Sequence, residues 1–444
     1  MAEIKEKILR GLNSGEFFAV IYQEQLNSRA DDSALLSALS ELHNNGHIDL
    51  VSQFAGLSRD DDKYDFFLMR RIFERVLPSI DSPTLPVINC LVHLTLESGN
   101  DQPANWVISP FIEFCQKDNQ RVEEAIDHVL DNIDPKIDML TPAMIAGSRI
   151  DIQNYAKRAI SLIGNESQVV SQRAICSLGR MNFEHRNEVR LNAFNSIMGA
   201  VSETSSETIL SAALKSLFSL CNHDDEMQER FIVFLRFLKE IIMPSNDLLI
   251  HSVSEILFLN QKNISTSIES ELLDLASLVN PENNITLQNI DYALECIINR
   301  GGLDDAIAVL ERIAERHGAG MHINSLNGVV RALVEDKKAL SFVMTRWLKS
   351  KKIIYGRLCH DLLMSTDEHG VEVFFDGKQL DGSSGDLNVF LAKKACGWLF
   401  TRPLSAISLI VSLVSQADEG EISELSDIAF NPLLISYPGS VRAF

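Results

Sequence analysis

Apolar residues return along the middle of the chain in groups spaced by about 40 residues. Five aliphatic residues open these groups: Val170, Leu210, Ile250, Ile290 and Val330. In the middle three groups further apolar residues follow three, seven and eight residues later, as in Val253, Leu257 and Phe258. The first group fits when it is shifted by one residue, and the last loses the pattern after Val334. This spacing is typical of one face of an α-helix. The pattern predicts an amphipathic helix that recurs at a fixed distance.

A second set of amphipathic helices lies between the recurring ones, within residues 224–243, 265–279 and 303–318. Pro244, Pro281 and Gly318 separate the two sets and favour turns. One unit of about 40 residues is therefore two helices and two turns. A single helix pair cannot bury its own apolar side, whereas stacked pairs bury it continuously. We therefore predict an all-α fold, a right-handed α-solenoid of antiparallel helix pairs.

One copy also carries a more specific signature. Val170, Arg173, Ala174, Leu178 and Gly179 together resemble the second helix of a HEAT repeat, and the period resembles that of HEAT or armadillo units. The other four copies keep the apolar positions but not the Arg or the Leu-Gly, so the resemblance covers about residues 150–350. It implies a superhelical stack with an elongated binding surface, and it implies no activity.

The chain divides into three predicted regions. Residues 1–134 form an irregular helical N-terminal region, 150–352 the HEAT-like array, and 353–444 a C-terminal capping or docking module. The stretch VEVFFDGKQLD, residues 371–381, reads as a β-hairpin whose two-residue turn is Asp376-Gly377. We expect two further helices after it, over 387–400 and from Pro403 onward.

Composition and charge indicate the cellular compartment of the protein and limit the kinds of partner it can bind. The 444 residues carry a net charge of −21, which disfavours non-specific binding of nucleic acid or anionic membranes. Seven scattered cysteines without a C-x-x-C pair predict free thiols and a cytoplasmic location. The first residues lack the apolar core of a signal peptide, and the longest apolar run, 404–414, is too short to span a bilayer.

The chain contains none of the common nucleotide-binding, hydrolase or zinc-protease motifs, so we predict no catalytic residue, cofactor or metal. His43 and His47 have metal-ligand spacing, but the Asn-Asn-Gly between them favours a helix end. Cys359, His360 and Asp361 are consecutive, and consecutive helix residues point about 100° apart, so coincidence is favoured over a triad.

One local cluster of positive charge departs from the acidic background. Lys338, Arg346, Lys349 and Lys352 fall on one side of a predicted helix, and Arg357 adds charge at its edge. Such a face is typical of a solvated amphipathic helix. The alternative is a docking site for phosphate or for an acidic partner surface. These five residues are our candidate partner-binding site.

The architecture favours a non-catalytic protein–protein interaction scaffold, or a regulatory subunit of a larger intracellular assembly, with protein partners and no small-molecule substrate. Two alternatives remain open. The first is a nucleic-acid-associated helical-repeat protein that uses the basic face. The second is an enzyme with an unrecognised site, for which Asp376 and Lys378 are the best candidate pair.

Overall fold

The computed structural model describes residues 1–28, 32–60, 63–99, 108–202, 206–222, 224–368, 371–375, 377–380 and 385–443. Within these ranges the regular structure is helical, and no β-strand occurs. The chain divides into two compact units, Met1–Glu229 and Arg230–Phe444. The all-α class is therefore confirmed, whereas the three regions proposed from the sequence stay a prediction.

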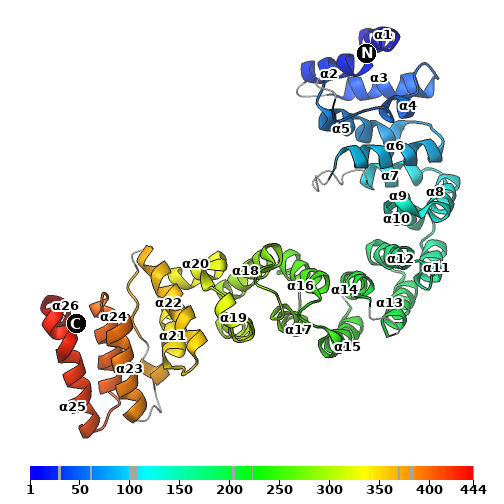
Figure 1. The fold of residues 1–444 in the computed structure, drawn as a ribbon. Coiled ribbons are helices and arrows are strands. Elements are labelled where there is room, and N and C mark those ends of the chain that lie inside the picture. The colour runs from blue at the N-terminus through cyan, green and yellow to red at the C-terminus, as the bar shows by residue number, and fades with distance from the viewer. Residues whose placement is uncertain are drawn as a thin grey trace. The chain divides into compact units, whose positions relative to one another are not determined.

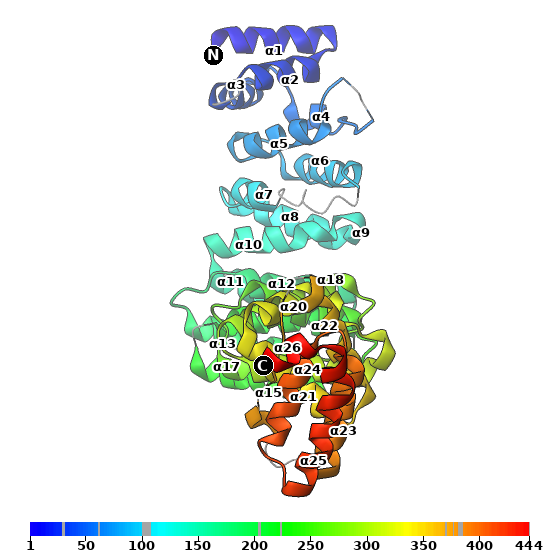
Figure 2. The same cartoon turned by 90° about the vertical axis from the view of Figure 1, so that its left-hand side faces the viewer.

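The first unit is a succession of short helices, which Figure 2 shows as layers from α1 to α10. Its helices are α1 (Ala2–Ser14), α2 (Phe17–Asn27), α3 (Ser33–Asn44), α4 (Leu50–Phe54), α5 (Phe66–Val76), α6 (Thr84–Glu97), α7 (Ile108–Cys115), α8 (Asn119–Asp131), α9 (Ile133–Lys136), α10 (Leu140–Ile150), α11 (Ile152–Ile163), α12 (Gln168–Arg180), α13 (Asn187–Ser202) and α14 (Glu207–Cys221). α10 packs on α12 and α12 on α14, while α11 packs on α13.

The second unit repeats this arrangement. α15 (Asp225–Ile241) crosses the boundary between the units. The remaining helices are α16 (Asp247–Leu259), α17 (Thr266–Ala276), α18 (Asn284–Asn299), α19 (Leu303–His317), α20 (Asn327–Glu335), α21 (Lys337–Lys349), α22 (Ile353–Glu368), α23 (Gly385–Trp398), α24 (Pro403–Val414), α25 (Glu419–Ile428) and α26 (Pro438–Ala443). Figure 1 shows α16, α18 and α20 in one row and α17 and α19 in another.

The recurring helices predicted from the sequence are α12, α14, α16, α18 and α20. They begin at residues 168, 207, 247, 284 and 327, so the step between neighbours varies around 40. In α16, Ile250, Val253 and Leu257 are buried, as the pattern predicts. Phe258, at the eighth position of the pattern, instead lies on the outer side and is 39% exposed. The paired, all-helical architecture fits a helical-repeat protein.

Ion pairs connect neighbouring helix pairs at a regular separation in sequence. Arg173 of α12 pairs with Asp138, and Arg190 of α13 pairs with Asp224 at 2.6 Å. In the second unit, Arg236 of α15 pairs with Glu271 of α17 at 2.9 Å. The partners are 34 or 35 residues apart, which is close to one repeat. A cation on one pair therefore meets a carboxylate on the adjacent pair.

The start of α20 is capped by a residue of the preceding pair. The Asp291 carboxylate of α18 accepts hydrogen bonds from the backbone N–H groups of Gly328, at 2.8 Å, and Val329, at 2.9 Å. A Cβ at position 328 would lie 2.6 Å from a carboxylate oxygen of Glu295 and 3.2 Å from both carboxylate oxygens of Asp291, so these side chains would have to move. Burial raises the pKa of Asp291, and the two N–H donors oppose that rise. The Asp291 carboxylate thus helps to fix the register of α18 against α20.

The β-hairpin predicted at 371–381 is wrong. Residues 371–375 form no strand, and η6 (Gly377–Leu380) is a 3-10 helix. Ser side chains satisfy this backbone: Phe375 N–H donates to Ser408 Oγ of α24 at 3.3 Å, and Ser341 Oγ of α21 donates to the Phe374 carbonyl. The alternating apolar residues Val373 and Phe375 are buried against helices. Alternation of apolar and polar residues can therefore arise without a partner strand. Asp376 lies outside the described residues.

Candidate functional site

The predicted basic face lies on α21 and at the start of α22, in the second unit. Asp336 caps α21, and its carboxylate accepts the backbone N–H groups of Lys338 at 2.8 Å and Ala339 at 3.2 Å. The apolar side of the helix is buried, including Leu340, Val343 and Trp347. The amphipathic helix expected from the wheel is therefore present, and its cations face away from the core.

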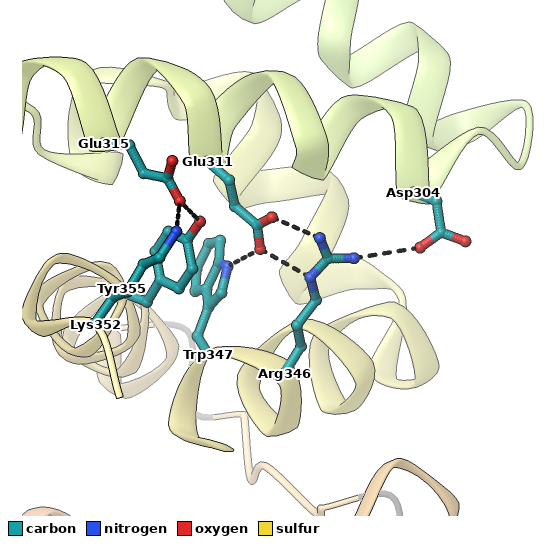
Figure 3. Close-up of polar contacts among 7 residues, drawn as sticks. All are labelled: Asp304, Glu311, Glu315, Arg346, Trp347, Lys352 and Tyr355. Carbon is teal, nitrogen blue, oxygen red and sulfur yellow. Dashed lines mark hydrogen bonds and ion pairs between the residues drawn. The ribbon is translucent and has the colours of Figure 1, made fainter. Parts of the chain in front are cut away.

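Glu311 of α19 is the centre of a polar network that links α19 to α21 (Figure 3). Its carboxylate accepts hydrogen bonds from Arg346 Nε at 2.8 Å, Arg346 Nη2 at 2.5 Å and Trp347 Nε1 at 3.0 Å. Arg346 Nη1 also lies 3.7 Å from Asp304. Both Glu311 and Trp347 are buried. This bidentate geometry is the strong form of an Arg–carboxylate contact.

A second carboxylate extends the network by one helical turn. Glu315 accepts hydrogen bonds from Lys352 Nζ and from the Tyr355 hydroxyl, which come from the start of α22 and the residues before it (Figure 3). These two donors lower the pKa of Glu315. Burial and the Glu315 hydrogen bond raise the pKa of Tyr355. Consecutive carboxylates on α19 therefore hold both α21 and α22.

The five predicted partner-binding cations do not share one environment. Arg346 and Lys352 are held by Glu311 and Glu315, and Lys349 Nζ donates to the Gln379 carbonyl at 3.1 Å. Lys338 and Arg357 are exposed. The hydrogen bonds and ion pairs of this network tie neighbouring helices together. A partner-binding role for these five residues stays a prediction.

The other chemical candidates from the sequence are dispersed. α3 ends at Asn44, His43 Nδ1 accepts the Leu50 backbone N–H at 3.1 Å, and His47 is exposed, so the helix-end interpretation is confirmed. Cys359 is buried, and burial raises its pKa to about 12. Asp361 lies 3.2 Å from His322 and 3.7 Å from His360, but the Cys359 thiol is buried against Met344 Sδ, 3.8 Å away, whereas His360 is exposed, so the three groups do not form a triad. The side chains of Asp376 and Lys378 lie outside the described residues.

One surface feature was missed by sequence analysis. Large apolar side chains are exposed along the outer side of α16 and α18, which lie next to each other. We call this the α16–α18 apolar patch, and it consists of Leu248, Phe258, Leu259, Ile285 and Tyr292. The sequence does contain an indication of this patch. The end of α16, Leu-Phe-Leu, has more apolar residues than the one buried face of the helix needs.

The fold and these sites define the class of the molecule as an all-helical chain of successive helix pairs. Comparison of the chain with family models, with curated proteins and with solved structures gives no match. In the part of the chain that the structure describes, no group of three or more His, Cys, Asp or Glu side chains is placed to hold a metal ion. None of the helices described combines the length and apolar content needed to cross a bilayer.

Proposed function

We propose that this chain is a HEAT-like α-solenoid that acts as a non-catalytic protein-binding scaffold within a larger assembly. The α16–α18 apolar patch is the observation that carries the proposal. Leu259 and Ile285 are 72% and 67% exposed, and an apolar patch on a folded surface is a mark of a protein interaction site. The seven free thiols support a reducing, cytoplasmic setting.

The patch is a surface that the fold itself holds in place. The rings of Phe258 and Tyr292 meet edge to face, with centroids 5.1 Å apart. At the other end of the helices, His251 Nδ1 and Thr286 Oγ1 lie 3.0 Å apart and fix the register. The apolar residues on the opposite sides of α16 and α18 are buried and form the core, whereas the patch residues keep 39% to 72% of their surface exposed. A partner that covers them gains apolar burial without unfolding anything.

Site-specific photo-crosslinking tests this proposal. A benzophenone amino acid is placed at Leu259 in the full chain, expressed in its own cells, and the matched control carries it at Glu240, an exposed position on α15. We expect a defined protein adduct from position 259 and none from position 240. We further expect the double variant L259D/Y292D to lose that protein on co-purification while its helical circular dichroism is unchanged. Identical adducts from both positions, or none from 259, would refute the proposal.

A further inference from the structure

The first unit contains a cavity of about 580 Å³ where the end of α10 meets the turn between α12 and α13. Its size is in the range of small-ligand sites. Three basic side chains line it: Arg149 from the last turn of α10, and His185 and Arg186 from the turn before α13. The lining thus brings two guanidinium groups and one imidazole together in a chain of net charge −21.

Local contacts hold the Arg149 side chain and the backbone of the turn that carries His185 and Arg186, and all three basic side chains are exposed to solvent. Arg149 Nη1 donates to Gln116 Oε1 at 2.9 Å, which fixes the guanidinium and leaves its other N–H groups available. Phe183 is buried and anchors the turn, and its carbonyl accepts the Arg186 backbone N–H at 2.7 Å. Asn182 Oδ1 accepts the Glu184 backbone N–H at 3.1 Å. Phe183 therefore anchors the turn, and His185 and Arg186 come directly after this anchor in the sequence.

The charge balance of the cavity favours an anion. Glu184 also lines the cavity, and its carboxylate accepts a hydrogen bond from Asn182 Nδ2 at 3.1 Å. His185 and Arg186 have no ion-pair partner among the residues that the structure describes. α13 begins directly after Arg186, so the positive end of its dipole is close, although Glu188 in the first turn offsets part of that field.

The size of the anion follows from the charge of the whole chain. A long polyanion would extend beyond the cavity and be repelled by the net charge of −21 that the whole chain carries. A compact anion responds mainly to charges within about 8 Å, the screening length at physiological salt, and so it responds to the two guanidinium groups and the Glu184 carboxylate that line the cavity. A phosphate monoester carries a charge of about −1.5 to −2 at neutral pH and presents three acceptor oxygens. Planar guanidinium groups match these oxygens two at a time.

We propose that the cavity lined by Arg149, His185 and Arg186 binds a phosphate monoester group. This group is carried either by a phosphorylated segment of a protein or by a small molecule. The site lies in the first unit, and it is separate from the α16–α18 apolar patch in the second unit. The variant L259D/Y292D therefore leaves this site intact, and each proposal can fail without the other.

Fluorescence anisotropy of the full chain tests the proposal. The probes are a labelled Gly/Ala peptide with one phosphoserine and the same peptide without phosphate. We expect the phosphorylated probe to bind at least tenfold more tightly, and R149Q/R186Q to weaken its binding at least tenfold. The matched control K262Q/K393Q removes the same charge from two exposed positions of the second unit and is expected to bind like the unaltered chain. Thermal unfolding of both variants establishes that they are folded.

Competition assigns the source of the phosphate. If inorganic phosphate displaces the probe near the probe's own Kd, the site recognises the free group, and the ligand is a small molecule. If displacement needs roughly a hundredfold more phosphate, the peptide contributes and the ligand is a phosphorylated protein. Both results support the proposal. Equal binding of the two peptides, equal loss in both variants, or tighter binding of a single-stranded DNA oligonucleotide would overturn it.

Discussion

Glu311 is a buried carboxylate that accepts three hydrogen bonds from two consecutive residues of a neighbouring helix. Glu315 lies one turn further along α19. It also accepts hydrogen bonds, from the Lys352 ammonium group and the Tyr355 hydroxyl, but it is partly exposed. The two sites have the same chemistry and differ in burial. We expect burial to determine how much each site contributes to the free energy of unfolding. A buried donor that loses its partner cannot form a replacement hydrogen bond with water.

We therefore predict that E311Q destabilises the second unit by about 2 kcal/mol. The amide keeps one acceptor oxygen, but it faces Arg346 and Trp347 with a donor and without charge. The control E315Q should cost less than about 1 kcal/mol, since exposed ion pairs contribute little. Urea unfolding followed by circular dichroism measures both values. A double-mutant cycle with R346Q isolates the Arg346 contact, and a coupling near zero would show that Arg346 adds no stability through Glu311.

At the scale of helices, close approach of two backbones sets the spacing between successive pairs in the first unit. A Cβ at Gly179 of α12 would lie 2.6 Å from the Ser216 Cα of α14. Ser216 Oγ also donates to the Ile175 carbonyl at 2.9 Å, so the two helices are joined at that crossing. The Leu-Gly that resembles the HEAT signature thus has a packing reason in this chain. Gly179 allows α14 to pass close to α12.

We predict that G179A lowers stability by about 1–3 kcal/mol, the cost of forcing an extra group into a packed contact. The clash is with backbone, which cannot rotate away as a side chain can. The matched control is G199A in α13, where nothing lies within 4 Å of the added Cβ. That change is expected to stabilise by about 0.5–1 kcal/mol through helix propensity. Thermal unfolding compares the two, and a G179A melting temperature equal to that of G199A would contradict the close approach.

At the scale of the whole molecule, each of the two units has its own buried core. In arrays of this kind, stability is close to a sum of repeat terms and neighbour terms, so a division between repeats leaves the packing within each part largely intact. The natural place to divide the chain is directly before α15, since this keeps that helix whole.

We predict that fragments 1–224 and 225–444 each fold when they are produced separately. Each should show helical circular dichroism and a cooperative thermal transition, and the intact chain should show two transitions at related temperatures. Calorimetry and far-ultraviolet circular dichroism measure these quantities. A fragment that stays unfolded at all temperatures, while the intact chain melts in one step, would show that the units depend on each other for folding.

Local periodicity explains what the sequence by itself determined. The spacing of apolar residues and the helix-breaking residues between them were enough to predict the all-α class and the buried face of helices such as α16, because helix periodicity is a property of neighbouring residues. The same reasoning failed at residues 371–375, where alternation suggested a strand. There the segment satisfies its backbone with Ser side chains of α21 and α24, which lie at least 30 residues away along the chain.

Contacts between helices decided the rest. The sequence pattern placed Arg346 and Lys352 on one basic face. In the structure both form ion pairs with carboxylates of α19, a helix that belongs to a different helix pair. The cavity lined by Arg149, His185 and Arg186 draws on elements that are about 35 residues apart, so no local pattern contains it. The outward position of Phe258 likewise follows from packing against α18. A charged side chain meets its ion-pair partner, and a cavity acquires its lining, only when stacking brings separate repeats together. For this reason only the tertiary structure could show the sites.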